Sequence, residues 1–399
     1  MKKQLLCTSA IALGCAIAAP ASAQEWDMDW GGFFNTHVAY TDVGGSGVLP
    51  TQDFDGVNVF VNREIHFTPS VTLDNGLTFG VNVQMEADNS SAPSSDIDET
   101  YMTISSDTMG KIILGNENSA GYLSMGSVYT PGVGSLGINS GSISGFMPLT
   151  GSAYTFRSAA GSSLTEVGSN NDVPRITYFT PSFNGLTVGV SYAPNGDFAT
   201  GNARNNGAVD HDAAGGLRDI FDIGASYKQS FNGVDLALAG RYGTGERQAQ
   251  PAVAAVPAVP GNAGTAAIAA APGGDPETWG IGATVGMSGF TVGATYAEND
   301  SDVAGGAGDQ EGWSLGATYD IPGPWTVGLD TYQGEFKNGA GVSKDEYEAY
   351  KLGASRSLGA GVSWDVYAIY AETTNGSVGG LTDTKIDATI IGTAINLSF

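Results

Sequence analysis

The chain has 399 residues, with 41 acidic side chains against 16 basic ones and a formal net charge of −25 at pH 7. This acidic balance disfavours nucleic acid as a partner, because like charges repel, and it attracts cations. Charged residues make up only 14 % of the chain, whereas glycine occurs 59 times and aromatic residues reach 10 %. The composition therefore excludes an acidic disordered protein and indicates an all-β fold.

The first residues have the features of a secretory signal peptide. Lys2 and Lys3 are followed by an apolar stretch at 5–19 and by the small-x-small sequence Ala-Ser-Ala at 21–23. We therefore predict that residues 1–23 direct export and are cleaved. A membrane-spanning anchor is the alternative, but the apolar stretch is short for one.

The two cysteines of the chain, Cys7 and Cys15, both lie in this leader. A lipid-modified Cys15 is a weaker alternative to simple cleavage. The mature domain at 24–399 is expected to contain no disulfide and no sulfur-ligated metal. We expect it to form one domain that is stabilised by hydrogen bonding and burial.

Apolar side chains recur at every second position through most of this domain. In 290–297, for example, Phe290, Val292, Ala294 and Tyr296 share one face, and small or polar residues occupy the other. Period-two alternation is the signature of a β-strand with two different environments on its faces.

Short glycine-containing turns alternate with longer polar connections. Short turns provide the positive φ that tight hairpins need. The seven short turns are at 74–76, 108–110, 182–185, 231–233, 286–289, 320–324 and 356–361, and the eight longer connections are near 42–56, 87–98, 115–173, 194–218, 243–276, 298–311, 334–345 and 372–384. Fifteen connections join sixteen strands, so we predict an up-and-down antiparallel meander with strands of about 9–11 residues.

This pattern predicts a transmembrane antiparallel β-barrel. Sixteen strands enclose a bore too wide for Gly, Thr, Ser and Asn to fill, so we expect a wet interior and an apolar face toward lipid. Aromatic residues near the strand ends fit an interfacial girdle. These are Trp279, Trp313, Trp325, Trp364, Tyr192, Tyr227, Tyr242, Tyr296 and Tyr319.

The last strand-like segment, 388–399, ends on Phe399. Lipid offers no partner for unpaired backbone groups, so the first and last strands of a barrel must pair with each other. We predict that 31–41 is the partner of this last strand.

The segments 63–88, 111–129 and 174–196, together with Phe399, resemble the Gram-negative general-diffusion porin family in its sixteen-stranded alphaproteobacterial form. The resemblance implies a homotrimer of barrels, each with its own pore. It also implies that the C-terminal aromatic residue marks the chain for the barrel assembly machinery.

In this family the third long loop folds inward and constricts the pore, and its carboxylates face basic residues on the wall. The corresponding loop here is 115–173. Its charged residues are Glu117, Glu166, Asp172 and Arg157. These acids are few for the family pattern, so a strong transverse field is not expected.

Strand parity predicts which charged residues face the lumen. A charge on the lipid face costs up to about 2–4 kcal/mol for Arg or Lys at mid-bilayer, so the inward face is favoured. The predicted pore-lining residues are Glu64, His66, Glu86, Arg175, Arg241, Asp330, Lys351 and Asp365. Arg63 has the opposite parity and is expected near the rim or in a subunit contact.

No cofactor is required by any motif in the chain. The acidic clusters 96–99 and 298–302 are expected in external loops, where two interpretations stay open: Ca²⁺ binding, or a solvated acidic rim. His37, His66 and His211 show no metal-ligand spacing. The proline-containing segment 249–274 is predicted to be a flexible external loop.

The sequence thus predicts an outer-membrane porin that passes small hydrophilic solutes and ions and prefers cations. Its expected surroundings are outer-membrane lipids and lipopolysaccharide. The alternatives are a substrate-specific porin, an outer-membrane barrel protease or lipase that uses His37 or His66, and a secreted soluble β-protein. No nucleophile motif of an enzyme is present.

Overall fold

The computed structural model describes residues 25–87, 97–139, 141–149, 170, 172–196, 216–254, 270, 272–377 and 382–399. The predicted signal peptide at 1–23 lies outside the described residues, as does most of the predicted loop at 249–274. Arg157 and Glu166 also lie outside them.

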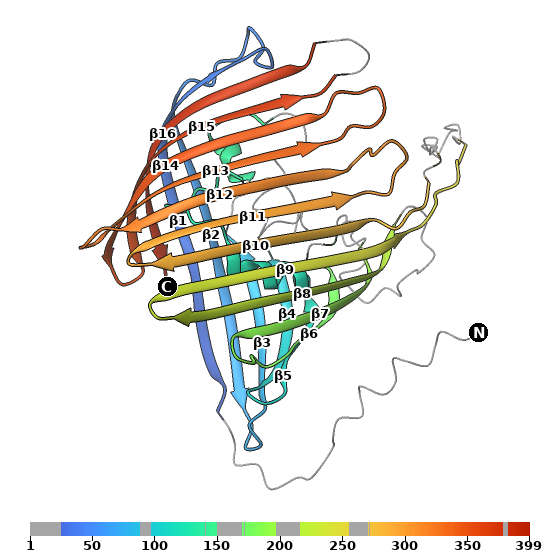
Figure 1. Ribbon diagram of the computed structural model, residues 1–399, viewed down its shortest axis with the longest axis vertical. Coiled ribbons are helices and arrows are strands. Elements are labelled where there is room, and N and C mark those ends of the chain that lie inside the picture. Colours follow the sequence, from blue (N-terminus) through green and yellow to red (C-terminus); the bar gives the residue numbers. More distant parts are fainter. Residues whose placement is uncertain are drawn as a thin grey trace, which may run out of the picture.

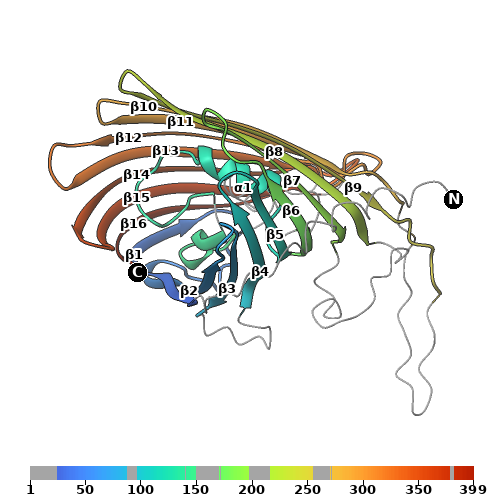
Figure 2. The ribbon, with the colours of Figure 1, turned by 90° about the horizontal axis from the view of Figure 1, so that it is seen from below.

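Sixteen strands within the described residues form one closed antiparallel barrel (Figures 1 and 2). The strands are β1 (Asp27–Gly44), β2 (Gly56–Thr72), β3 (Thr78–Glu86), β4 (Ile97–Ser106), β5 (Gly110–Asn116), β6 (Pro174–Phe179), β7 (Leu186–Asn195), β8 (Leu217–Phe231), β9 (Val234–Arg247), β10 (Glu277–Met287), β11 (Phe290–Asp300), β12 (Gln310–Asp320), β13 (Trp325–Phe336), β14 (Asp345–Gly359), β15 (Val362–Asn375) and β16 (Thr384–Ser398). Each strand pairs with its neighbours in sequence, which confirms the predicted meander.

The barrel is closed by β1 and β16, as predicted. The register runs from Phe33 opposite Ser398 to Gly44 opposite Asp387. Beyond the last strand, the backbones of Gly32 and Phe399 exchange two hydrogen bonds of 3.0 and 3.1 Å. The chain end is therefore paired with β1, and no open sheet edge meets the surrounding lipid.

Tight turns gather at one end of the barrel, as the sequence predicted. At the β8–β9 turn, Asn232 and Gly233 have φ values of 50° and 82°. Positive φ at both central residues is the type I′ geometry that suits the twist of two antiparallel strands. Asn and Gly adopt this conformation most readily, which explains why this dipeptide occurs there.

The strands are less uniform in length than predicted. The sequence suggested 9–11 residues, whereas β1 has 18 residues and β6 has only 6. The first residues of β1 extend beyond its pairing with β16 and pair with β2 alone, from Asp27 opposite Ser70 to Gly32 opposite Ile65. The short strand begins at Pro174, whose missing N–H restricts it to a strand end.

The two faces of the strands differ in exposure as the alternation predicted. Ile390 is fully buried, whereas the next residue, Ile391, is 60 % exposed. Outward-facing aromatic pairs lie near both barrel ends, with Trp279 packed on Tyr296 at one end and Trp325 on Trp364 at the other. The outward face is therefore the apolar, aromatic one that contacts lipid.

The inward face departs from the prediction along one arc of the wall. Around β13 to β16 and β1 it carries large apolar side chains rather than only small polar ones. A buried cluster here includes Tyr332, Tyr347, Tyr367, Ile369, Ile386 and Ile390. These side chains are buried because a connecting segment packs against them inside the barrel, a contact that strand parity cannot reveal.

Short helical segments α1 (Ala120–Met125), η1 (Gly126–Val128) and η2 (Gly141–Gly145) lie in the connection between β5 and β6. None of the helices in the described ranges is long and apolar enough to cross a membrane. Figure 2 shows α1 inside the ring of strands, next to β8 and β9.

Candidate functional site

The connection between β5 and β6, residues 117–173, is called the third loop below. Its described part is 117–139, 141–149, 170 and 172–173. The contacts of the third loop follow the wall in order: Ala120 N donates to Ser191 Oγ on β7 at 3.1 Å, and Thr130 Oγ1 hydrogen-bonds to Ser314 on β12. Ser135 Oγ then reaches Asn396 on β16 at 2.5 Å. The third loop therefore passes across more than half of the inner wall.

Glycines on the wall allow the third loop to approach closely. A Cβ at Gly224 would lie 2.4 Å from Ser124 Oγ, and one at Gly316 would lie 1.8 Å from the carbonyl oxygen of Pro131. Similar clashes would arise at Gly282, Gly293 and Gly328 with Val128, Pro131 and Val133. We call Gly224, Gly282, Gly293, Gly316 and Gly328 the glycine track. It follows the path of the third loop across β8, β10, β11, β12 and β13.

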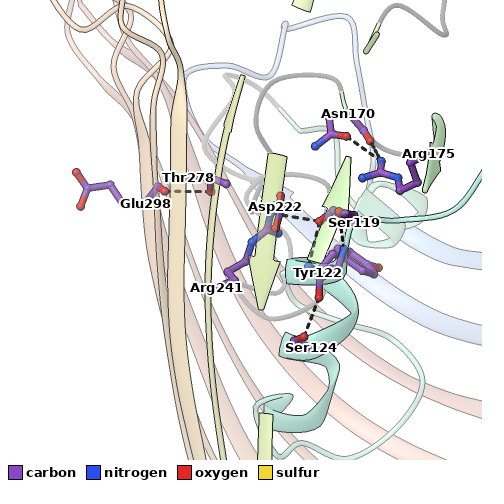
Figure 3. A network of polar contacts seen from close by, with 11 residues as sticks. Ser119, Tyr122, Ser124, Asn170, Arg175, Asp222, Arg241, Thr278 and Glu298 are labelled. Atoms are coloured by element: carbon purple, nitrogen blue, oxygen red, sulfur yellow. Dashed lines mark hydrogen bonds and ion pairs between the residues drawn. The ribbon is translucent and has the colours of Figure 1, made fainter. Parts of the chain in front are cut away.

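A buried ion pair supports the first helix of the third loop (Figure 3). Arg241 Nη2 on β9 lies 2.6 Å from Asp222 Oδ2 on β8, and the two side chains are 0 % and 1 % exposed. The same Nη2 donates to Ser119 Oγ at 3.4 Å. Ser119 is the N-cap of α1 and accepts a hydrogen bond from Tyr122 N. The wall thus fixes the start of α1 by a charge-assisted contact.

The middle of the third loop is held by β14. Lys351 Nζ donates to the carbonyl oxygen of Leu136 at 3.0 Å and lies 3.5 Å from Asp330 Oδ2. The Tyr347 hydroxyl donates to the carbonyl oxygen of Ile138. These contacts satisfy backbone groups that the inward fold removes from water.

Apolar side chains of the same segment complete its attachment. Leu136, Ile138, Ile143, Phe146 and Met147 belong to the buried cluster that covers the inward residues of β13 to β16 and β1. Phe146 also contacts Phe60 of β2, with ring centroids 6.1 Å apart. The third loop is therefore packed on the wall and not suspended across the lumen.

The two ends of the third loop meet at a buried acidic cluster. Glu117, Asp172 and Glu99 of β4 each offer a carboxylate oxygen within 4.8 Å of the other two. Glu117 lies at the beginning of the loop and Asp172 near its end. Burial raises the pKa of the Glu117 carboxyl above its ordinary value, an effect opposed by hydrogen bonds from Asn118 and Tyr101.

Two of the predicted constriction residues, Glu117 and Asp172, lie at the two ends of the third loop, and whether they constrict the pore stays a prediction. Glu117 and Asp172 are only 4 % and 7 % exposed, so they lie buried at the loop ends and do not face open solvent. The boundary also differs, since Gly115 and Asn116 belong to β5. The cluster 96–99 was expected in an external loop, but Glu99 lies on β4 with 8 % exposure. Its carboxylate is buried because the loop ends pack over it.

The predicted lumen charges lie on the inward face of their strands. Arg175, Arg241, Asp330, Lys351 and Asp365 are all less than 9 % exposed. Arg175 Nη2 donates to the backbone and side-chain oxygens of Asn170. Most of these side chains hold the third loop or a neighbouring wall residue, a contribution that parity alone does not indicate.

On β2, His66 Nε2 lies 2.9 Å from Glu64 Oε1. Glu86 of β3 is opposite Glu64 in the register. Arg63 points outward, as predicted, and lies over the Phe34 ring at 5.7 Å. Their contribution to conduction remains a prediction.

His37, one of two histidines considered for an enzyme, does contact a serine. Ser135 Oγ lies 3.2 Å from His37 Nε2, and Tyr367 OH lies 3.2 Å from His37 Nδ1. A catalytic nucleophile–base pair needs a carboxylate or a similar group to orient the base, whereas Tyr367 offers His37 only a neutral phenol. Ser135 also donates to Asn396, and His37 is 1 % exposed, so this arrangement fits loop attachment better than catalysis.

Cavities lie between the described part of the third loop and the wall. One of about 580 Å³ lies under α1 and is lined by residues that include Ser124, Ser127, Ser182, Thr187 and Lys228. Another of about 180 Å³ is bordered by Thr130, Ser135, Asp330 and Lys351. Both linings are rich in hydroxyl and charged groups, so they suit water and small polar solutes.

Sequence reasoning missed the glycine track, Asp222 and Asn118. The alternation of inward and outward positions along β8 was the one sequence feature that could have indicated Asp222, because it places Asp222 on the same polar face as Gly224. From the sequence, the glycines were interpreted only as residues too small to fill a wide bore. The structure shows that glycine is required at these positions because the third loop, which is distant in sequence, contacts the wall there.

A closed sixteen-stranded barrel with an apolar outer face and a loop packed inside its lumen defines the class of channel-forming outer-membrane barrels. The family model described as Gram-negative porin matches residues 8–377. The chain therefore belongs to the Gram-negative porin family and is an outer-membrane porin. No curated protein matches the chain at a significant level of sequence similarity.

Solved structures of related fold include the anion-selective porin from Comamonas acidovorans, with a TM-score of 0.59, 14 % identity and coverage of 94 % of this chain and 100 % of that one. In-vitro folded OmpT, an outer membrane protein of Vibrio cholerae, has a TM-score of 0.58 and 13 % identity, with coverage of 96 % and 100 %. A trimer form of the Vibrio protein has a TM-score of 0.56 and 12 % identity, with coverage of 94 % and 99 %. At these low sequence identities, the similarity to the solved structures is a similarity of fold alone.

Proposed function

We propose that this porin is a passive, non-enzymatic channel for small hydrophilic solutes and ions, with a preference for cations. The observation that carries the proposal is the excess of acids on the inward wall and loop ends. Among the described residues, the buried charged side chains comprise eight acids and three bases: Glu64, Glu99, Glu117, Asp172, Asp222, Asp330, Asp345 and Asp365 against Arg175, Arg241 and Lys351.

Two of the three bases are already paired with acids of the same set. Arg241 pairs with Asp222, and Lys351 lies beside Asp330. Glu64 and Asp365 also lie on the inward face of the wall, and this acidic excess supports a net negative field, which concentrates cations in a narrow passage with low-dielectric walls. The anion selectivity in the name of the Comamonas porin belongs to that protein, since lumen charges vary independently of a shared fold.

Reconstitution in planar bilayers tests this function. We expect discrete conductance steps and, under a salt gradient, a reversal potential of the sign that cation permeation gives. Heat-unfolded protein is the matched control. Absence of steps would refute the channel, whereas steps with an anion-type reversal potential would refute only the cation preference.

We further propose that the functional unit is a homotrimer in contact with lipopolysaccharide. Support comes from the trimer form of a related fold and from exposed apolar residues on the outward face of β1 and β2, such as Val38, Tyr40, Val57 and Val59. Sedimentation of the detergent-solubilised protein should give three times the chain mass. A monomer that remains fully conducting would contradict this proposal.

Export is proposed to involve cleavage after Ala23, followed by insertion through the barrel assembly machinery with Phe399 as its signal. N-terminal sequencing of the protein from outer membranes should begin at Gln24. A retained leader would contradict the proposed cleavage.

A further inference from the structure

We propose that the cavity under α1 is a weak binding site for anionic sugars. The ligand class is a hydroxylated ring that carries one acidic group, either a carboxylate or a phosphate. The inference deepens the proposed channel function by naming a class of solute, and it rests on that function for the route by which the solute arrives.

The cavity lies where α1 meets the wall, near the tight turns. Its volume of about 580 Å³ falls within the roughly 300–1,000 Å³ of sites that bind small molecules. Inward residues of β6, β7 and β8 form its wall side, and α1 contributes Leu123 and Ser124. Short turns mark the periplasmic end of an outer-membrane barrel. A solute that crosses the bore from outside therefore meets this cavity close to its exit.

The strand register brings hydroxyl groups and an ammonium group together at the cavity. Thr187 of β7 is directly opposite Ser226 of β8, and Lys228 follows two positions later on the same inward face. The β6–β7 turn adds Ser182 to the lining. None of these four residues is buried, and within the described ranges their side chains make no hydrogen bond or ion pair. Their polar groups are therefore available to a ligand.

Lys228 gives the cavity its charge. It is the one charged residue among the described residues that line the cavity. Asp235 lines a neighbouring cavity of about 220 Å³ that also includes Lys228. The Asp235 carboxylate accepts a hydrogen bond from Ser230 Oγ, and among the described residues it forms no ion pair with Lys228. A second base, Lys111 of β5, is opposite Phe179 in the register of β5 and β6. The site therefore attracts an anion.

Phe179 supplies an aromatic surface. A Cβ at Gly189, which is opposite Phe179 in the register, would lie 2.3 Å from Phe179 Cε1 and 3.0 Å from its Cζ. The ring therefore lies over the β7 backbone, where only glycine leaves room for it, and it also lines the cavity. The negative face of an aromatic ring attracts the C–H groups of a sugar ring.

The three kinds of group select the ligand class together. An apolar ligand would leave the hydroxyls and the ammonium group without partners. A simple inorganic anion would not use the aromatic ring, and a cation would be repelled by Lys228. A hydroxylated ring with one acidic substituent uses all three. Because acids exceed bases elsewhere in the lumen, the site would offset the repulsion of such solutes locally and retain them near the exit without excluding other solutes.

Saturation-transfer NMR of the folded, detergent-solubilised full-length protein tests the site with D-glucuronate, D-glucose 6-phosphate and D-glucose. We expect at least one of the two anionic sugars to bind about two- to fivefold more tightly than glucose, the range that a partly exposed ion pair contributes. The tighter of the two identifies the acidic group. Equal affinity for all three sugars, or no binding of any, would overturn the proposal. This comparison uses wild-type protein, so it does not depend on the folding of a variant.

Lys228→Gln should abolish the preference for the anionic sugar and keep the binding of glucose, because the hydroxyls and Phe179 remain. Arg356→Gln is the matched control. It removes the same charge at the same end of the barrel, but Arg356 lies over the Trp325 ring on the outer face. A preference that survives Lys228→Gln, or that Arg356→Gln reduces equally, would overturn the proposal.

Single-channel recording separates this inference from the proposed channel function. We expect the anionic sugar, added on the tight-turn side, to cause brief reductions in current that saturate with concentration and that Lys228→Gln shortens. Conductance steps without such reductions, in protein that binds no sugar by NMR, would overturn the inference and leave the channel intact. Sugar binding by NMR without any conductance steps would refute the channel and leave the site.

Discussion

Gly121 of α1 lies directly over the ion pair between Arg241 and Asp222. A Cβ at Gly121 would lie 1.9 Å from Asp222 Oδ1 and 2.7 Å from Arg241 Nε. The pair itself joins β8 and β9 at 2.6 Å and is shielded from solvent. The helix that begins the inward course of the third loop thus rests on a buried charge pair, with no side chain between them.

Arg241→Ala should loosen this support. Removing one partner of a buried ion pair leaves the other charge uncompensated and costs about 3–5 kcal/mol. We expect a lower unfolding midpoint and larger, noisier single-channel conductance, because α1 loses its contact with the wall. Arg218→Ala is the matched control, since the Arg218–Glu246 pair at 3.2 Å is partly exposed. Equal effects of both changes would contradict a special contribution of Arg241.

Gly316→Ala should displace the third loop. The added methyl would collide with the carbonyl oxygen of Pro131, and such overpacking costs about 1–3 kcal/mol. Gly353→Ala is the control on a nearby strand, because its Cβ would be 3.4 Å from Val133 Cβ, an ordinary contact. We expect altered conductance and reduced heat stability in the first variant alone. Unchanged behaviour of Gly316→Ala would refute the glycine track.

Lys351→Met and Asp330→Asn should shift ion selectivity in opposite directions. The two side chains border the cavity between the third loop and β14. One unit charge at roughly 8 Å in water changes the local ion concentration about twofold. We expect the cation-to-anion permeability ratio to rise by about that factor in Lys351→Met and to fall in Asp330→Asn. Lys344→Met, on an exposed loop lysine, is the control that should leave the ratio unchanged.

Phe399→Ala should lower the yield of assembled barrel severalfold while the assembled fraction remains as stable as wild type. The Phe399 backbone pairs with Gly32, but its side chain is 66 % exposed and contributes little to packing. Quantifying folded protein in outer-membrane fractions measures the effect. Leu397→Ala, an outward residue of the same strand, is the control. Similar losses in both variants would argue against a terminal signal.

Much of the fold was predictable because a membrane barrel repeats local rules. Alternating exposure, glycine turns and the pairing of 31–41 with the last strand all follow from period-two patterning and the need to satisfy backbone groups in lipid. The predicted aromatic bands follow from the same alternation, as Trp279 and Trp325 illustrate on opposite ends of the barrel.

The interior of the barrel was less predictable, because its contacts join residues far apart in sequence. Parity placed Arg241 and Lys351 on the inward face, but it did not indicate that they hold Ser119 and Leu136 of the third loop. Nor did it show that Glu99, assigned by sequence to an external acidic loop, meets Glu117 across neighbouring strands. The local sequence pattern predicts which face of the strand a residue occupies. The residue that it contacts on that face depends on the path of the third loop through the barrel.

A cross-link between Val133 of the third loop and Gly353 of β14 tests most directly the central claim, that this loop lies against the inner wall of a conducting bore. A Cβ at Gly353 would be 3.4 Å from Val133 Cβ, close to the separation in disulfides. Cys7 and Cys15, the chain's own cysteines, precede the barrel. We expect Val133→Cys/Gly353→Cys to form a disulfide and to keep wild-type conductance steps both before and after reduction. Failure of the disulfide to form, or a conductance that changes when it is reduced, would contradict the account.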